Sequence, residues 1–149
     1  LVADKPGDTQ FVEAYGWKIV CTLAGDPDLG DSGDTVTLAY ANFENQTIYL
    51  DATVVDYSII AHEAAHALED IALTDELRLE AALALGEADW NEADSYWSTP
   101  AEMFAESRMG CLGYEVDTDF KSMSCSTIDE IIAKSEFSTE IDTLEKTAK

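Results

Sequence analysis

The sequence predicts an α+β fold in which a small β-sheet precedes a mainly helical part. Three short runs rich in β-branched and aromatic residues lie within residues 1–55, separated by segments rich in Gly, Asp and Asn. Beyond residue 55, apolar residues recur with helical spacing over longer stretches. We therefore expect strands and loops over residues 1–55 and helices over residues 56–149.

The length and the apolar content suit a single domain. The chain has 149 residues, of which 46% are hydrophobic, and this is enough for one hydrophobic core. No internal repeat divides the sequence. We expect one domain over residues 1–149.

The N-terminal elements follow from composition and turn residues. A short helix is expected at 11–15, ending at Gly16. Strands are expected at 17–23, 35–41 and 47–50. The last two strands are separated by only a few residues, which predicts a hairpin. The sequence does not indicate which strand lies at the edge of the sheet.

The segment between the first two strands, residues 25–34, is rich in Gly and Asp and predicts a loop. Its aspartates, at positions 26, 28, 31 and 34, carry the hard oxygen ligands that calcium prefers. Their spacing differs from that of an EF-hand loop, so a solvated loop is the preferred interpretation.

The helical part begins with a segment that has no Gly or Pro between Val54 and Glu80. Asp56 or Ser58 can cap the first helix. A second helix is expected at 75–85, followed by Gly86.

Two further helical regions follow. Thr99 opens a helix that runs to about Cys111, with Pro100 at the favoured first position. The tail at 127–147 predicts one or two amphipathic helices, beginning with a capping box formed by Thr127 and Glu130.

The charge of the chain is strongly acidic. Eight basic residues stand against 31 acidic residues, which gives a formal net charge of −23. Such a surface repels phosphate backbones, so no nucleic-acid partner is expected, whereas neutral or basic substrates are favoured at encounter. Solubility or adaptation to salt explains the same charge equally well. No apolar run reaches the length of a membrane span, so no membrane partner is expected, and we expect a monomer.

The three cysteines allow three pairings, and the sequence does not choose among them. Cys111 and Cys125 flank a loop of 13 residues, where a disulfide would tie the end of one helix to the start of another. We predict this bond, with Cys21 left as a thiol. A disulfide, few basic residues and an acidic charge together predict secretion. The chain starts at Leu1 without a visible signal peptide, which we interpret as a mature form or a fragment.

The segment at 62–66 reads H-E-A-A-H and holds the only two histidines of the chain. On a helix, His62 and His66 lie one turn apart on one face, which is the geometry that a zinc ion needs from two of its ligands. Glu63 lies beside them and can take a proton from a water molecule that the ion activates. The segment therefore predicts a catalytic zinc site.

A catalytic zinc usually takes three protein ligands and leaves one position for water. Glu69 is a poor third ligand, because on an unbroken helix it lies about 10 Å along the axis from His62. Glu102 and Glu106 share a face of the third helix, so one can bind zinc while the other accepts a hydrogen bond from a ligand histidine. In a competing interpretation Glu102 is the capping partner of Thr99, which would leave Glu106 as the ligand.

The H-E-x-x-H segment and the downstream helix with two glutamates resemble the gluzincin metallopeptidases. The segment A-E-M-F-A-E at 101–106 is similar to the E-F-F-A-E segment of lethal-factor-like and Pro-Pro endopeptidases. The resemblance covers about residues 47–110. It implies a small zincin-like fold, one zinc ion per chain, and hydrolysis of a peptide or protein substrate. It also implies that Glu102 is the third ligand and that Glu106 supports His62.

The chain departs from the lethal-factor group in length. Only 35 residues separate His66 from Glu102, which suits a minimal gluzincin. The resemblance also implies a tyrosine upstream of the third ligand that shares the oxyanion of the tetrahedral intermediate with zinc. Tyr96 lies six residues before Glu102 and is our choice, while Tyr57 and Tyr114 stay as alternatives. Met103 and Phe104 are expected in the core.

Two other functions remain possible from the sequence. Peptide deformylases also use H-E-x-x-H, with a cysteine ligand in a Gly-Cys-Leu stretch; residues 110–112 have these letters but follow the metal helix instead of preceding it. The second is a metal-stabilised binding module without catalysis, which would not need Glu63. The sequence indicates neither the cleavage specificity nor whether the enzyme is an endopeptidase or an exopeptidase.

Overall fold

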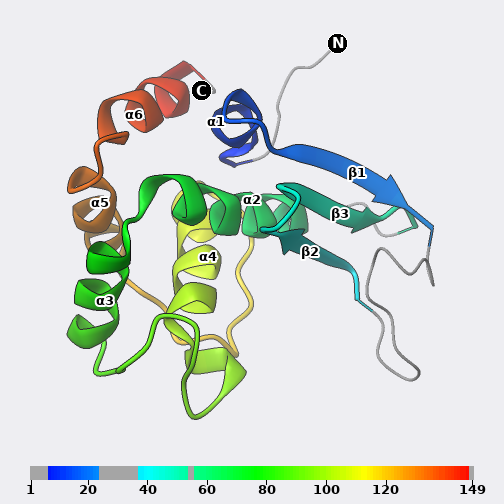
Figure 1. Cartoon of the computed structure of the whole chain (residues 1–149). Helices are drawn as coiled ribbons and strands as arrows, with labels where there is room; N and C mark the ends of the chain where they lie inside the picture. Colours follow the sequence, from blue (N-terminus) through cyan, green and yellow to red (C-terminus); the bar gives the residue numbers. More distant parts are fainter. Residues whose placement is uncertain (1–6, 24–36, 54–55, 148–149) are drawn as a thin grey trace.

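The computed structural model describes residues 7–23, 37–53 and 56–147, and it has the predicted α+β architecture (Figure 1). The described elements are, in chain order, α1 (Thr9–Ala14), β1 (Lys18–Thr22), β2 (Ala39–Asn42), β3 (Thr47–Asp51), α2 (Tyr57–Ala72), α3 (Asp75–Ala84), the 3₁₀ turn η2 (Tyr96–Ser98), α4 (Pro100–Cys111), α5 (Cys125–Ala133) and α6 (Ser138–Thr147). The Asp-rich loop for which calcium was considered lies outside the described residues.

The sheet has the order β1-β3-β2, with β1 parallel and β2 antiparallel to β3. The central strand β3 buries Ile48 and Leu50, whereas β1 and β2 form the two edges. The predicted hairpin is present, and the side chain of Asn42 accepts hydrogen bonds from backbone N–H groups in its turn. Among the described residues, the strand expected at 35–41 lies at Ala39–Asn42, where the chain pairs with β3; positions 35 and 36 lie outside the described residues.

Helix α2 is the central element, and it packs against α1, α4 and the strands β2 and β3 (Figure 1). Its start is capped by Asp56, whose carboxylate accepts a hydrogen bond from the backbone N–H of Ser58. The buried alanines of α2, among them Ala61, Ala64 and Ala65, are small enough to let the neighbouring elements approach closely. The helix ends where Leu73 becomes extended.

Helix α4 begins at Pro100, as the sequence predicts, and most of its side chains are buried. Met103 and Phe104 lie in the core, as expected. Arg108 is also buried, and its guanidinium donates two hydrogen bonds to Asp8 at the start of α1. A buried charge of this kind is tolerated because its partner and its hydrogen bonds are both present.

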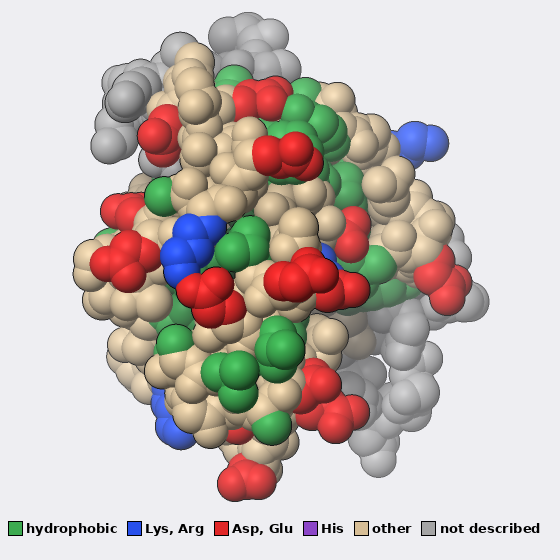
Figure 2. Space-filling model, turned by 60° about the vertical axis from the view of Figure 1, so that its left-hand side comes forward, with side chains coloured by type: hydrophobic (Ala, Val, Ile, Leu, Met, Phe, Trp, Pro, Cys, Tyr) green, Lys and Arg blue, Asp and Glu red, His purple; other side chains and the backbone are tan. Residues whose placement is uncertain are grey.

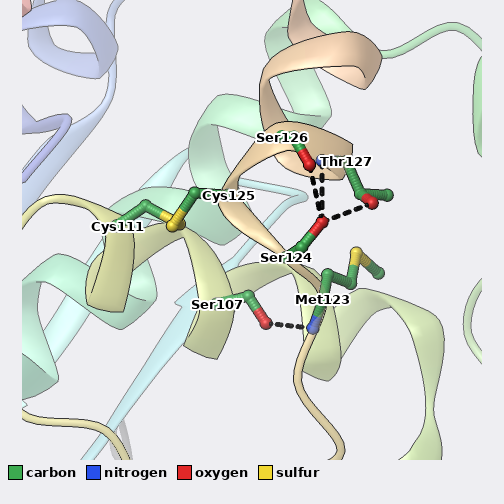
Figure 3. Close-up of a disulfide and its surroundings, with 7 residues drawn as sticks. All are labelled: Ser107, Cys111, Met123, Ser124, Cys125, Ser126 and Thr127. Carbon is green, nitrogen blue, oxygen red and sulfur yellow. Dashed lines mark hydrogen bonds between the residues drawn. A yellow bond between two sulfur atoms is a disulfide. The ribbon is translucent and has the colours of Figure 1, made fainter.

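The predicted capping box of Thr127 and Glu130 is wrong. Helix α5 begins earlier, at Cys125, and its cap is Ser124, whose hydroxyl accepts a hydrogen bond from the backbone N–H of Thr127 (Figure 3). Thr127 therefore lies inside the first turn and not before it.

The predicted disulfide between Cys111 and Cys125 is confirmed (Figure 3). It joins the last residue of α4 to the first residue of α5. A hydrogen bond from the backbone N–H of Met123 to Ser107 Oγ, 2.8 Å long, fastens the same junction. Cys21, on the edge strand β1, is an exposed free thiol. The disulfide therefore holds the intervening segment, residues 112–124, at the end of α4.

Acidic side chains are spread over the face seen in Figure 2, with few Lys and Arg side chains between them. This distribution agrees with the formal net charge of −23. Among the described residues, no helix is both long enough and apolar enough to cross a membrane.

Replacing Cys111 and Cys125 together by Ser should lower the free energy of unfolding of the metal-free protein by about 3 kcal/mol, because a disulfide that closes a loop of about 15 residues restricts the unfolded chain by this amount. Chemical denaturation measures the change. The control is Cys21→Ser, which should alter stability by less than about 0.5 kcal/mol because the thiol is exposed and unpaired. A double variant as stable as the parent would contradict the structural role of the bond.

Candidate metal centre

Helix α2 presents the two histidines side by side. His62 and His66 are one turn apart, and their ring centroids lie 4.9 Å from each other. Both side chains are largely covered, since α2 is enclosed by the sheet on one side and by α4 on another. Only 13% of the His62 side chain and 10% of the His66 side chain are exposed, so little of either ring contacts bulk water.

Glu102 on α4 faces both imidazoles. Its carboxylate oxygens lie 3.1 Å from His62 Nε2 and 3.3 Å from His66 Nε2. One donor atom from each of the three residues lies within 4.8 Å of the others, so the group is close enough to hold a metal ion. Two ligands bound tetrahedrally at about 2.1 Å from an ion lie about 3.4 Å apart, which agrees with the spacing of these atoms. The structure thus brings together all three predicted ligands.

Glu106 approaches His62 from the side opposite Glu102. Its Oε2 lies 2.8 Å from Nδ1 of His62, and its other oxygen accepts a hydrogen bond from the backbone N–H of Asp117. A carboxylate in this position holds a proton on Nδ1 and leaves Nε2 free to bind a metal. This is the supporting position predicted for Glu106.

Glu69 has a position that the sequence reasoning missed. It does not reach the cluster of donor atoms, as predicted, but its Oε1 lies 4.0 Å from Nδ1 of His66. Trp90 Nε1 donates a hydrogen bond of 3.0 Å to its other oxygen. Burial raises the pKa of Glu69 to about 7. Glu69 follows His66 by three residues on one helix, and this spacing could have identified it as a neighbour of that histidine.

The competing assignment of Glu102 as a capping partner does not fit the structure. Thr99 is the N-cap residue of α4, but its side chain makes no capping hydrogen bond. The Thr99 hydroxyl instead donates to the carbonyl oxygen of Ser95. The carboxylate of Glu102 is therefore available to the two histidines.

The charges of the cluster shift the pKa values of its members. Burial lowers the pKa of His62, but hydrogen bonds to Glu102 and Glu106 outweigh this effect and raise it to about 10. Burial raises the pKa of Glu102, but hydrogen bonds from His62 and His66 hold it well below its usual range. The metal-free site is thus a set of imidazolium–carboxylate pairs.

Glu63 is buried beside the histidines, with 9% of its surface exposed. Burial raises the pKa of its carboxyl group, and the positive charges of His66 and His62 oppose this shift. A backbone hydrogen bond from Ala41 of β2 also stabilises the carboxylate. The edge strand and the metal-binding helix are therefore connected directly at Glu63.

Tyr96, from the 3₁₀ turn before α4, reaches the cluster. Its hydroxyl donates a hydrogen bond of 3.0 Å to Glu102 Oε2, and its ring lies against Trp97 and Phe120. Burial and the charge of Glu102 raise the pKa of the hydroxyl. Of the three candidate tyrosines, only Tyr96 contacts the cluster among the described residues. Tyr57 is exposed at the start of α2, and the Tyr114 hydroxyl accepts a hydrogen bond from the backbone N–H of Gly7.

Two cavities adjoin the cluster, and both are lined in part by His62, Glu63 and Tyr96. The larger, of about 350 Å³, lies toward the start of α2, and the smaller, of about 230 Å³, extends to His66 and Glu69. Strand β2 runs past both, so the cluster lies between two cavities that follow this strand and that we together call the cleft.

Cys111 does not take part in the cluster, because its sulfur is bonded to Cys125. The thiolate ligand that a deformylase-like site requires is therefore absent at this position.

Comparison with known proteins gives no match among family descriptions, curated proteins or solved structures. The function is therefore inferred from the geometry of the cluster and the cleft.

Glu102→Ala should lose most of its metal under mild dialysis, because it leaves the ion with two protein ligands. Glu106→Ala should bind about 10–100-fold more weakly than the parent yet still load when metal is supplied, because it removes the hydrogen bonds to His62 and from the backbone of Asp117 but none of the three candidate ligands. Titration against a competing chelator measures both affinities, with Glu130→Ala on the exposed side of α5 as the control. A much weaker site in Glu106→Ala than in Glu102→Ala would reverse the two roles.

Metal binding should release a proton at pH 7.5. The metal-free His62 is protonated there, since its pKa is about 10, and Nε2 must lose its proton to bind an ion. The affinity should therefore fall by about tenfold per pH unit on acidification for each proton displaced. Calorimetry in two buffers of different ionisation enthalpy counts the protons. An affinity that does not change between pH 6 and pH 8 would contradict the charged state assigned to His62.

Proposed function

We propose that this chain is a secreted zinc-dependent peptidase that hydrolyses peptide bonds. The observation that carries the proposal is the convergence of His62, His66 and Glu102 from two helices on one point, with the buried Glu63 beside it and an open cleft in front. Three ligands of this kind with one free position are typical of catalytic zinc, whereas structural zinc sites are closed by four protein ligands.

Zinc is the metal that suits two imidazoles and one carboxylate at this spacing. When bound, it supplies a Lewis acid that polarises a carbonyl group and makes water acidic near neutral pH. Glu106 holds Nδ1 of His62 by a hydrogen bond and so leaves Nε2 of that ring free for the ion, while the carboxylate of Glu69 lies 4.0 Å from Nδ1 of His66.

Glu63 is the general base of the proposed reaction. It takes a proton from the attacking water and passes it to the leaving amine. A raised pKa makes the carboxylate a better base than an exposed glutamate, and Glu63 lines both cavities beside the cluster. Tyr96 can turn its hydroxyl from Glu102 to the oxyanion that forms when water attacks.

A peptide is the substrate class that the cleft favours. Strand β2 is an edge strand whose outer side has no strand partner among the described residues, and it runs along the cleft. An extended peptide can pair with such an edge through main-chain hydrogen bonds. Because the cleft continues on both sides of the cluster, we infer an endopeptidase.

The cellular setting is part of the proposal. The disulfide between Cys111 and Cys125 supports secretion, since such bonds persist in oxidising environments. The acidic surface makes nucleic acid an improbable partner, and a monomer stays the expected state.

Glu63→Gln should retain one zinc per chain and lose at least about 100-fold in kcat, because the amide cannot accept the proton. Tyr96→Phe should lose about 100-fold in kcat with little change in KM, because a single oxyanion donor acts only in the transition state. Cleavage of a mixed peptide library followed by mass spectrometry measures activity, and metal analysis measures loading. Tyr57→Phe, at an exposed site, is the control and should behave as the parent.

Two results would overturn the proposal. The first is a zinc-loaded parent that cleaves no member of the library, which would favour a metal-stabilised binding module. The second is cleavage that persists at the same rate after removal of the metal by a chelator.

A further inference from the structure

The larger cavity beside the cluster has a composition suited to one kind of side chain. Its wall is mostly apolar, and the apolar residues that line it are Leu38, Ala39, Ile59, Trp97, Met109 and Phe120. Four acidic residues also line it: Glu63 and Glu106 are buried at the cluster, whereas Glu115 and Asp117 are exposed, which places them at its mouth. None of its lining residues among those described is Lys or Arg.

The two carboxylates at the mouth are available to an occupant. Asp117 accepts a hydrogen bond from the backbone N–H of Asp119 through one oxygen, which leaves its second oxygen toward solvent. Lys121 follows closely in sequence but lies outside the lining, and its backbone N–H bonds to the carbonyl of Trp97. The mouth of the cavity is thus negatively charged, in a protein whose net charge is −23.

The course of β2 relates the cavity to the scissile bond. Leu38 and Ala39 line the larger cavity, whereas Tyr40 and Ala41 line the smaller one, with the cluster between them. A peptide that pairs antiparallel to β2 has its C-terminal part over the start of that strand. In that orientation, the larger cavity receives the side chain that follows the cleaved bond.

We propose that this cavity takes a lysine or arginine side chain, so that the enzyme cleaves before basic residues. The proposal rests on the peptidase function proposed above. The aliphatic stem of such a side chain packs on the apolar wall, while its cation stays at the mouth, near water and near Glu115 and Asp117. An uncharged straight chain gains the same apolar contact without the attraction of the two carboxylates.

The test compares peptides that differ only in the residue after the cleaved bond. Lysine and norleucine have the same straight stem, and only lysine carries the ammonium group. The parent should cleave the lysine peptide with about tenfold higher kcat/KM, since each partly exposed ion pair contributes up to about fivefold. The preference should shrink in high salt, which screens exposed charges.

Glu115→Gln with Asp117→Asn should remove this preference and leave cleavage of the norleucine peptide unchanged. Asn at 117 keeps an oxygen for the backbone of Asp119, so the local turn is preserved. Glu130→Gln, on the exposed side of α5, makes the same kind of charge change away from the cleft and should retain the lysine preference.

A binding measurement separates this proposal from catalysis. Zinc-loaded Glu63→Gln is titrated with each peptide, and binding is followed by tryptophan fluorescence because Trp97 lines the cavity. The variant should bind the lysine peptide more tightly than the norleucine peptide. Equal or better cleavage and binding of the norleucine peptide would overturn the basic specificity while leaving the peptidase intact. Absence of any cleavage, with neither peptide bound, would overturn both proposals.

Discussion

The contact between His62 on α2 and the two glutamates of α4 is the interaction on which the rest of the site depends. Glu102 meets Nε2 of the ring and Glu106 meets Nδ1, so a single imidazole fixes the rotation of α4 against α2. Helix α2 also carries buried alanines, whose small side chains let neighbouring elements approach it closely. The alanines thus serve the packing of α2, whereas His62 and the two glutamates carry the chemistry of the site.

The segment after α4 extends this arrangement to the cleft. The disulfide and the bond between Met123 and Ser107 hold residues 112–124 against the helix. From this segment the backbone N–H of Asp117 reaches Glu106, and the ring of Phe120 packs on His62. This segment contains no helix or strand, and it forms one side of the cleft. It stays in place because it is attached to the rest of the protein at both ends and in the middle.

The sequence predicted the helices and the ligand set well, because both depend on local spacing. H-E-A-A-H on a helix defines His62 and His66, and two glutamates four apart on a second helix narrow the third ligand to two candidates. It could not choose between Glu102 and Glu106, or find the contacts of Glu69 and Phe120, because these depend on how distant segments pack. The early start of α5 was missed because Ser124 competes with Thr127 as the cap, and the disulfide at Cys125 favours the earlier position.

The charges at the centre of the cluster suit a cation. Glu63, Glu69, Glu102 and Glu106 surround only two imidazoles in a region that is mostly buried. In the metal-free protein, hydrogen bonds to Glu102 and Glu106 raise the pKa of His62, and burial raises the pKa of Glu63, so both groups hold their protons more strongly than usual. In the proposed metal-bound state, a divalent cation would replace these protons and reverse the local preference of each ionisable group. Glu63, whose neutral form is favoured by burial, would then be an ionised base next to the positive charge. On this proposal burial alone favours the acid form of Glu63, and the metal would be needed to make the carboxylate an effective base.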